Sequence, residues 1–117
     1  MNTESRNTDY QTVPPNHWQA YFDLLSKMAQ GRHMRLEVIG RSLGDQIEKE
    51  WNLFEGLSYD RQKDILYLHT RDLEHSIAKP RDVIAQEEGL VRSLSIRDSD
   101  GLIQIVHFRD PFLLKGT

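Results

Sequence analysis

Residues Gly89 to Phe108 read GLVRSLSIRDSDGLIQIVHF, and this stretch decides the fold. Two runs in which apolar and polar residues alternate lie on either side of Asp98-Ser99-Asp100-Gly101. An Asp-Gly pair supplies the positive φ angles that a tight turn needs, and alternation with a period of two is typical of a strand with one buried face. The stretch therefore predicts an antiparallel β-hairpin.

The apolar pattern also predicts how the two hairpin strands pair. A two-residue turn would place Ile96 opposite Ile105, and a four-residue turn would place it opposite Ile103. Either pairing gathers these residues with Leu94 on one face of the hairpin. A slip of one residue would instead place Ile96 opposite Gln104, so we expect that register to be excluded.

An amphipathic helix is predicted ahead of the strands, from Asn16 as its N-cap to Gly31 in a left-handed C-terminal cap. Its apolar residues recur at spacings of three and four, and they are Trp18, Tyr21, Phe22, Leu25, Met28 and Ala29. An aromatic stripe at this spacing favours packing on a sheet over an aromatic binding face. Before the helix, the chain is polar, and we expect residues 1–15 to form a disordered tail.

Alternating runs between the helix and the hairpin predict further strands. These cover residues 33–38, 45–54, 57–59, 65–69 and 83–86. A strand is favoured over a helix at 45–54, with Ile47, Trp51 and Leu53 on its apolar face. Residues 57–59 and 65–69 form a second hairpin, and 83–86 is a brief edge strand. Asp72 caps a short helix at 72–78, which Pro80 ends.

Together these elements predict an α+β fold, in a single domain over residues 16–117. The N-terminal amphipathic helix packs on a twisted, mostly antiparallel sheet of about five to seven short strands, with the short helix inserted near 72–78. An open sheet and a half barrel are both compatible with the pattern.

Composition excludes several classes of function. The chain of 117 residues has a net charge of −3 with both signs interspersed, so it has no broad positive field for nucleic acid or an anionic membrane. It contains no cysteine, which removes disulfides and thiolate chemistry and fits a reducing compartment. No apolar run approaches the roughly 20 residues of a membrane span. We expect a cytoplasmic protein that binds neither membrane nor nucleic acid.

Motifs for metals, cofactors and nucleophiles are missing from the sequence. His33, His69, His75 and His107 lack the spacing of a zinc site, and the DSDG turn lacks the downstream carboxylate of a calcium loop. No glycine-rich phosphate loop and no Gly-x-Ser-x-Gly elbow occurs. We expect no metal and no cofactor.

The order of the residues resembles a small bacterial family known only as a domain of unknown function. The resemblance extends over about Trp18 to Leu114. It rests on Trp18 and Phe22, Gly31-Arg32, Leu43-Gly44 with Gln46, Gly56 with Tyr59-Asp60, His75-Ser76-Ile77 with Pro80, Asp98 with Asp100-Gly101, Gln104-Ile105, and Phe108 with Pro111. It implies no activity, cofactor or catalytic residue.

The sequence favours a non-enzymatic protein-binding or accessory module that self-associates or binds a protein partner. The face of the final hairpin opposite Leu94 and Ile96 is mixed, and its apolar residues form the predicted interface: Val91, Leu102, Val106 and Phe108. The alternative is a small acid-base enzyme, a hydrolase or isomerase that uses Asp72, His75 or His107. A nucleic-acid module is a third possibility, which would need clustered arginines.

Overall fold

A computed structural model describes residues 10–40 and 44–114 of the chain. It contains eight strands, one α-helix and a short 3₁₀ helix. In chain order these are β1 (Tyr10–Thr12), η2 (Pro15–His17), α1 (Trp18–Ala29), β2 (His33–Gly40), β3 (Gly44–Asp60), β4 (Ile65–Thr70), β5 (Glu74–Ala78), β6 (Pro80–Glu88), β7 (Leu90–Asp98) and β8 (Ile103–Phe112). The predicted α+β class is confirmed, although the sheet has eight strands instead of five to seven.

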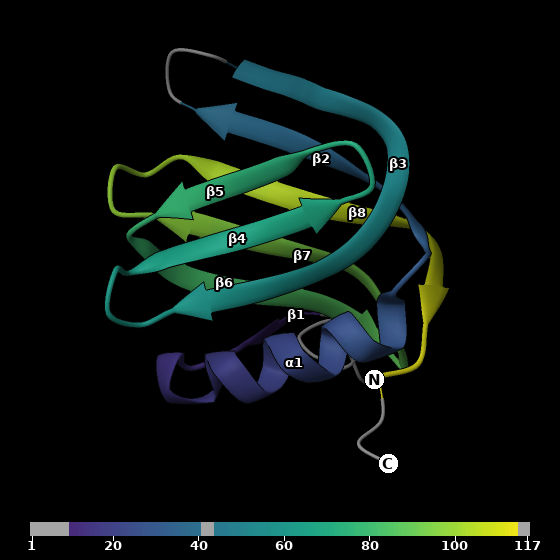
Figure 1. Ribbon diagram of the computed structural model, residues 1–117, viewed down its shortest axis with the longest axis horizontal. Helices are drawn as coiled ribbons and strands as arrows, with labels where there is room; N and C mark the ends of the chain where they lie inside the picture. The colour runs from purple at the N-terminus through teal and green to yellow at the C-terminus, as the bar shows by residue number, and fades with distance from the viewer. Residues whose placement is uncertain (1–9, 41–43, 115–117) are drawn as a thin grey trace, which may run out of the picture.

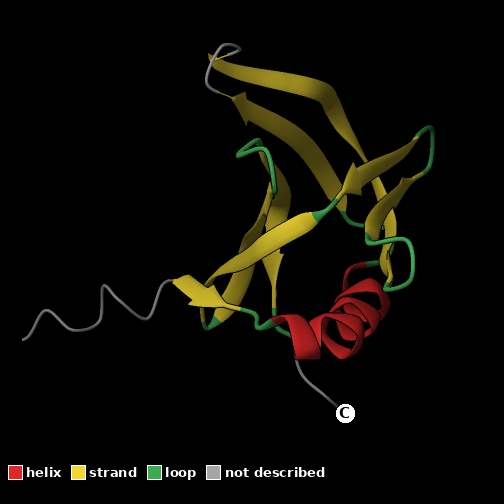
Figure 2. Cartoon of the chain, turned by 90° about the vertical axis from the view of Figure 1, so that its left-hand side faces the viewer, coloured by secondary structure: helices red, strands yellow, loops and turns green. Residues whose placement is uncertain are grey.

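The strands form one antiparallel sheet in the order β1-β6-β7-β8-β2-β3-β4-β5 (Figure 1). Its curvature comes from β3, whose first half pairs with β2 and whose second half, from Phe54, pairs with β4. The sheet therefore has two arms, and it stays open because β1 and β5 each pair on one side only in the described chain. Figure 2 shows α1 lying across the ends of both arms.

The helix is fixed to both arms by polar contacts. On one side the Tyr21 hydroxyl donates to Glu87 Oε2 of β6 at 3.2 Å. On the other side Ser26 Oγ accepts the Leu57 N–H of β3 at 2.8 Å. Gly56 permits this approach, since a Cβ there would lie 3.3 Å from Ser26 Oγ. The helix thus closes the core between the arms, and Trp18, the first residue of its apolar stripe, is 3% exposed.

The inner face of the sheet carries the core, and the outer face does not. The larger arm extends from β1 to the first half of β3. On its strands β6, β7, β8 and β2 the inward residues are Val83, Ala85, Leu94, Ile96, Gln104, Val106, Phe108, Met34, Leu36 and Val38, all buried. The residues between them in sequence, such as Ile84 on β6, Ile103 and Ile105 on β8, and Ile39 on β2, point to the other side and are only half-buried.

The register of the final hairpin is the one that the sequence interpretation excluded. Ile96 pairs with Gln104 and Leu94 with Val106, so Ile103 and Ile105 lie on the outer face. The reason is the turn, in which the Asp98 N–H donates to the Leu102 carbonyl and Gly101 adopts a φ of +88°. This leaves a three-residue loop, and an odd loop length reverses the faces relative to a two- or four-residue loop.

Three further sequence predictions are wrong. Residues 74–78 form strand β5 paired with β4, so no short helix occurs at 72–78. The tail ends earlier than residue 15, because Tyr10–Thr12 pairs with β6; residues 1–9 lie outside the described chain. Since β1 covers β6, the segment 83–86 is not an edge strand.

Other predictions need correction at particular residues. Asn16 does not cap α1; the N-cap is His17, without a side-chain hydrogen bond. The strand at 45–54 is confirmed within β3, but its faces are exchanged, since Trp51 is 39% exposed and Asn52 is 7% exposed. The side chain of Ile47 lies outside the described set. The strand at 33–38, the second hairpin and the left-handed Gly31 are confirmed. The helix stripe is confirmed except at Met28, which is 37% exposed.

Candidate functional site

The outer face of the larger arm carries an apolar groove. Two cross-strand rows form its floor: Ile84, Ser95 and Ile105 in one, and Asp82, Arg97, Ile103 and Ile39 in the other. With Tyr10 of β1, these residues line a concave region of about 420 Å³. We call it the isoleucine groove. Four isoleucines and a 60% exposed tyrosine on the face opposite the core form the kind of patch that marks binding surfaces.

Charged side chains of both signs border the isoleucine groove. Arg97 Nη2 contacts Asp82 Oδ2 across β6 and β7, and both side chains are about half exposed. Farther along the same face, His107 Nε2 lies 2.7 Å from Glu37 Oε1. Asp82 and Arg97, at one end of the second row, therefore place a pair of opposite charges at the rim beside the four isoleucines.

An arginine-aromatic cluster follows on the same face. The guanidinium carbons of Arg35 and Arg109 lie 5.2 Å and 5.7 Å from the centre of the Trp51 ring. Such contacts stabilise an exposed indole by about 0.5–1 kcal/mol each. Proteins that bind single-stranded nucleic acid combine a positively charged surface with several aromatic rings for base stacking. This cluster has one such ring in a chain of net charge −3, so it gives the nucleic-acid interpretation little support.

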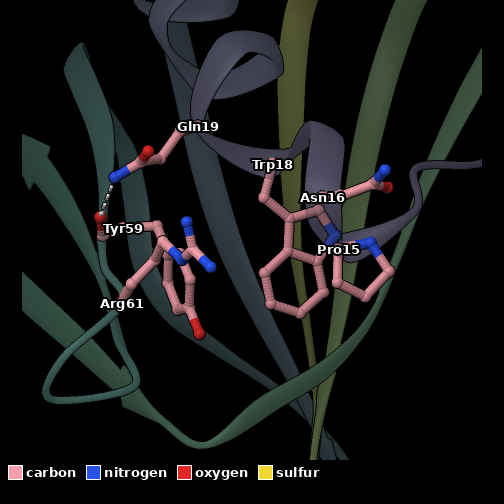
Figure 3. Close-up of a pocket in the computed structure, with 6 residues that line it drawn as sticks. All are labelled: Pro15, Asn16, Trp18, Gln19, Tyr59 and Arg61. Atoms are coloured by element: carbon pink, nitrogen blue, oxygen red, sulfur yellow. Dashed lines mark hydrogen bonds between the residues drawn. The ribbon is translucent and has the colours of Figure 1, made fainter.

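A second concave region lies where the start of α1 meets the end of β3 (Figure 3). It has a volume of about 370 Å³ and is lined by Pro15, Asn16, Trp18, Gln19, Tyr59 and Arg61. The Trp18 Nε1–H donates to the Val13 carbonyl at 2.8 Å, and its ring meets Tyr59 edge to face at 5.1 Å. Through these contacts the indole holds the segment after β1 and the start of α1 against the core.

Tyr59 belongs to a polar network at the β3–β4 turn. Its hydroxyl donates to Asp64 Oδ1 at 2.7 Å, and Arg81 Nη1 lies 3.0 Å from Asp64 Oδ2. Burial, and then the hydrogen bond to Asp64, raises the pKa of Tyr59. The hydrogen bond from Tyr59, with further help from Arg81, lowers the pKa of Asp64. Burial, followed by the charge of Glu87, likewise raises the pKa of Tyr21 on α1.

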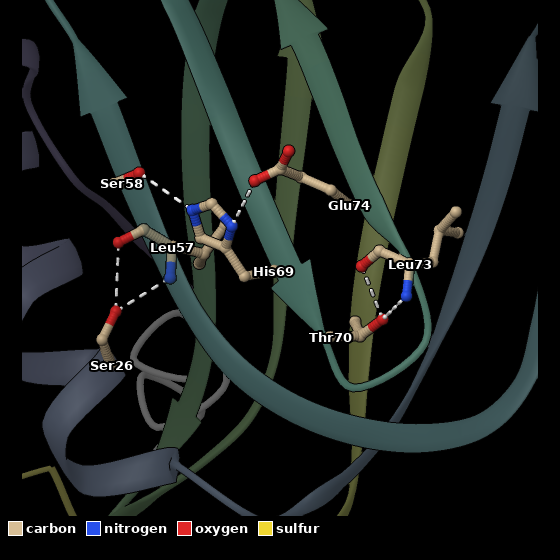
Figure 4. Close-up of polar contacts among 7 residues, drawn as sticks. All are labelled: Ser26, Leu57, Ser58, His69, Thr70, Leu73 and Glu74. Atoms are coloured by element: carbon tan, nitrogen blue, oxygen red, sulfur yellow. Dashed lines mark hydrogen bonds and ion pairs between the residues drawn. The ribbon is translucent and has the colours of Figure 1, made fainter.

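A third group of side chains lies on the outer face of the smaller arm (Figure 4). Ser58 Oγ of β3 lies 3.2 Å from His69 Nε2 of β4, and His69 Nδ1 lies 2.8 Å from Glu74 Oε2 of β5. Serine, imidazole and carboxylate thus stand in contact in the order used by acyl-transfer enzymes. Ser58 also lines a concave region of about 470 Å³ with Gln19, Tyr59, Asp60, Arg61, Gln62 and Tyr67.

The predicted interface residues are not on the surface. Val91, Val106 and Phe108 belong to the core, where they are 1%, 1% and 5% exposed, and Leu102 packs partly against it. The cause is the three-residue turn, which turns this side of β8 inward. In the folded chain Val91, Val106 and Phe108 are therefore not accessible to a partner. The mixed outer face is the one with Ile103 and Ile105.

The residues of the predicted acid-base site do not meet. Asp72 is exposed in the β4–β5 turn. His75 points into the molecule and contacts the Gln104 side chain, whereas His107 is on the outer face beside Glu37. Among the described residues, no group of three or more His, Asp or Glu side chains could hold a metal ion. No helix within residues 10–40 and 44–114 has the length and apolar content for a membrane span.

The sequence contained weak signals for the sites that it missed. Ile103, Ile105 and Ile84 alternate with the buried residues of their strands, so an apolar second face could have been noticed. Ser58 and His69 were both in the predicted second hairpin, and pairing outward from Asp60 and Ile65 places Ser58 beside Tyr67. The contact with Glu74 depends on β5, which was predicted as a helix.

Comparisons with known proteins give a family without an assigned function. The model of a family of unknown function, DUF5335, matches residues 9–116. An uncharacterized protein of Aquifex aeolicus (strain VF5) is 32% identical over 101 residues, which cover 85% of this chain and 91% of that protein. No solved structure matches the chain. The resemblance read from the sequence is confirmed: the chain belongs to the family of unknown function DUF5335.

Proposed function

We propose that this protein is a binding module that self-associates, with the isoleucine grooves of two copies facing each other. The observation that carries the proposal is the groove of about 420 Å³ on the sheet face opposite the core. Ile39, Ile84, Ile103 and Ile105 are only half-buried there. Covering them in a dimer removes apolar surface from water, which is favourable by about 25 cal/mol for each Å² of apolar surface buried.

The charges on the rim favour a second copy as the partner. In a two-fold symmetric dimer both copies use the same surface patch. Each contact between a residue of one copy and a different residue of the other therefore occurs twice. Asp82 and Arg97 lie side by side at the groove, so each copy presents both signs. Arg97 of one copy can then meet Asp82 of the other, and the reverse contact forms by symmetry. An unrelated partner would not require this self-complementary arrangement.

Ile105→Glu tests the apolar part of the interface. A charge in the dry centre of an interface is costly, whereas the half-buried position leaves the monomer folded. We expect light scattering over a range of concentrations to show a dimer for the wild type and a monomer for the variant. Ser76→Glu is the matched control, since it adds the same charge to an exposed position on β5 of the other arm. A wild type that stays monomeric at high concentration would overturn the proposal.

Charge exchange tests the partner and the symmetry. Asp82→Arg and Arg97→Asp alone each place like charges at both contacts of a symmetric dimer, so both variants should associate less than the wild type. Mixed in equal amounts, they should form a heterodimer in which both contacts again join opposite charges. Native mass spectrometry would count the three species. A statistical mixture, or no dimer at all, would contradict the symmetric arrangement.

A further inference from the structure

We propose that Ser58 is the nucleophile of an acyl-transfer site for small carboxylic esters, with His69 as its base and Glu74 as the group that orients the base. The site is independent of the proposed self-association, because it lies on the smaller arm of the sheet and the isoleucine groove lies on the larger arm. Its parts are the three contacting side chains and the concave region of about 470 Å³ that Ser58 lines.

The contacts assign a role to each side chain. Glu74 Oε2 lies 2.8 Å from His69 Nδ1 and favours the tautomer with the proton on that nitrogen. In neutral imidazole, Nε2 is then an acceptor, and the Ser58 hydroxyl donates to it over 3.2 Å. This is the protonation state in which a serine hydroxyl can lose its proton to histidine during attack.

Local structure holds the three groups in place. His69 pairs with Gly56 on one side and with Glu74 on the other. From this position the imidazole reaches Ser58, two residues beyond Gly56 on β3. The Tyr67 ring lies 6.3 Å from the His69 ring, at 23° to it, and supports one face of the imidazole.

The β4–β5 turn fixes the spacing between the base and the carboxylate. The Leu73 N–H donates to Thr70 Oγ1 at 3.1 Å, and the Thr70 hydroxyl donates to the Leu73 carbonyl at 2.8 Å (Figure 4). Asn52 Nδ2 also donates to Thr70 Oγ1, at 3.2 Å. His69 and Glu74 directly flank this turn, so their side chains meet without a long loop.

The neighbouring concave region indicates the substrate class. Tyr59 and Tyr67 provide apolar ring surface, and Arg61 provides a cation to the same concave region. A guanidinium remains charged at physiological pH and can stabilise the negative oxygen that forms when an ester carbonyl is attacked. The surroundings are open to water, with the Glu74 side chain 66% exposed, which suits a small ester with a good leaving group.

The reaction balances with water as the second substrate. Ser58 Oγ bonds to the carbonyl carbon while its proton passes to His69 Nε2, and that proton then leaves with the alcohol as the ester C–O bond breaks. Water next attacks the acyl carbon and gives a proton to Nε2. The bond from Ser58 Oγ to the acyl carbon breaks, and the serine takes the proton back. The sum is ester plus water to acid plus alcohol.

p-Nitrophenyl acetate is the probe. We expect nitrophenol release by the wild type and acetylation of Ser58, located by mass spectrometry of proteolytic fragments. Ser58→Ala should lower the rate by about 10²-fold, the size of a general-base-assisted contribution. Ser76→Ala, on the same face of β5, is the control and should leave the rate unchanged. Circular dichroism would verify that both variants are folded.

Glu74→Gln distinguishes orientation from chemistry. The amide keeps the size of the side chain but loses the charge that favours the productive tautomer, so kcat should fall about tenfold with KM unchanged. Acetylation at other residues, or a Ser58→Ala variant as active as the wild type, would overturn the proposal. The monomeric Ile105→Glu variant should retain the activity, so failure of one proposal does not decide the other.

Discussion

The His75 imidazole of β5 contacts the Gln104 amide of β8 in the interior of the molecule. Strands β2, β3 and β4 separate these two residues within the sheet, so the contact crosses from one arm to the other. It also explains how Gln104, which is 5% exposed, can occupy a core position. A buried amide is tolerated when a partner satisfies its hydrogen bonds.

This contact should be visible as a coupling energy. Gln104→Ala leaves the imidazole without its partner and should lower the free energy of unfolding by about 1–3 kcal/mol. His75→Ala should have a similar effect, and the double variant should lose about 1 kcal/mol less than the sum. Urea denaturation of the four proteins measures the cycle. Strict additivity would mean that the two arms are not joined here.

Phe108 and Ile105 of β8 should differ sharply in their contribution to stability, because they lie on opposite faces of the sheet. The Phe108 ring packs edge to face on Phe54, with 5.3 Å between the ring centres. Phe108→Ala should therefore lower the free energy of unfolding by about 3–5 kcal/mol. Ile105→Ala should cost about 1 kcal/mol or less. Thermal unfolding at low protein concentration compares the two variants. Equal losses would contradict the register of the hairpin.

The fit between α1 and β3 should not tolerate a methyl group at Gly56. The added Cβ would lie 3.3 Å from Ser26 Oγ, so the helix must shift from the Leu57 N–H that Ser26 now accepts. We expect Gly56→Ala to destabilise the fold by about 1–3 kcal/mol. In a Ser26→Ala background, where Oγ is absent, the same change should cost less. The difference between the two backgrounds, measured by chemical denaturation, isolates the close contact.

Acid should remove the contribution of Asp64 to stability. Its pKa is lowered in the folded protein, mainly by the Tyr59 hydroxyl and also by Arg81. A carboxyl with a lower pKa in the folded state stabilises it above the unfolded pKa of about 3.9, and the gain disappears as pH falls through the folded value. Asp64→Asn should therefore be less stable than the wild type at pH 7, and the gap should narrow below about pH 4.

Asparagine is the suitable replacement at this position, because Asp64 has a φ of +56° and asparagine tolerates that conformation. Asp60→Asn, in the same turn, serves as the comparison, since its carboxylate accepts backbone N–H groups from Gln62 and Lys63 instead of side-chain contacts. A stability gap for Asp64→Asn that does not change with pH would rule out a charge effect.

Local patterns in the sequence determined much of the fold. The stripe from Trp18 to Ala29 produced the helix, and period-two alternation placed β2, β3 and both hairpins. These features depend on neighbours within one element, so the period of the pattern identifies the type of element wherever that element is packed. The α+β class followed from them, whereas the resemblance to the family of unknown function rested on the order of particular residues.

Tertiary structure decided the faces and the sites. Ser99 to Gly101 form a three-residue loop, and this odd length turned Val106 and Phe108 inward and Ile103 and Ile105 outward. Local alternation is compatible with either result, because both sides of β8 are apolar. Gln104 became a core residue only through His75, which is 29 positions away in sequence.

The same reasoning applies to both candidate sites. Ser58 meets His69 across 11 positions because a hairpin brings them together, and Glu74 joins them only when 74–78 is a strand. The isoleucine groove requires five strands in one order, β1-β6-β7-β8-β2. Spacing along the chain does not encode these contacts, because burial of one face of the whole sheet sets the strand order and register.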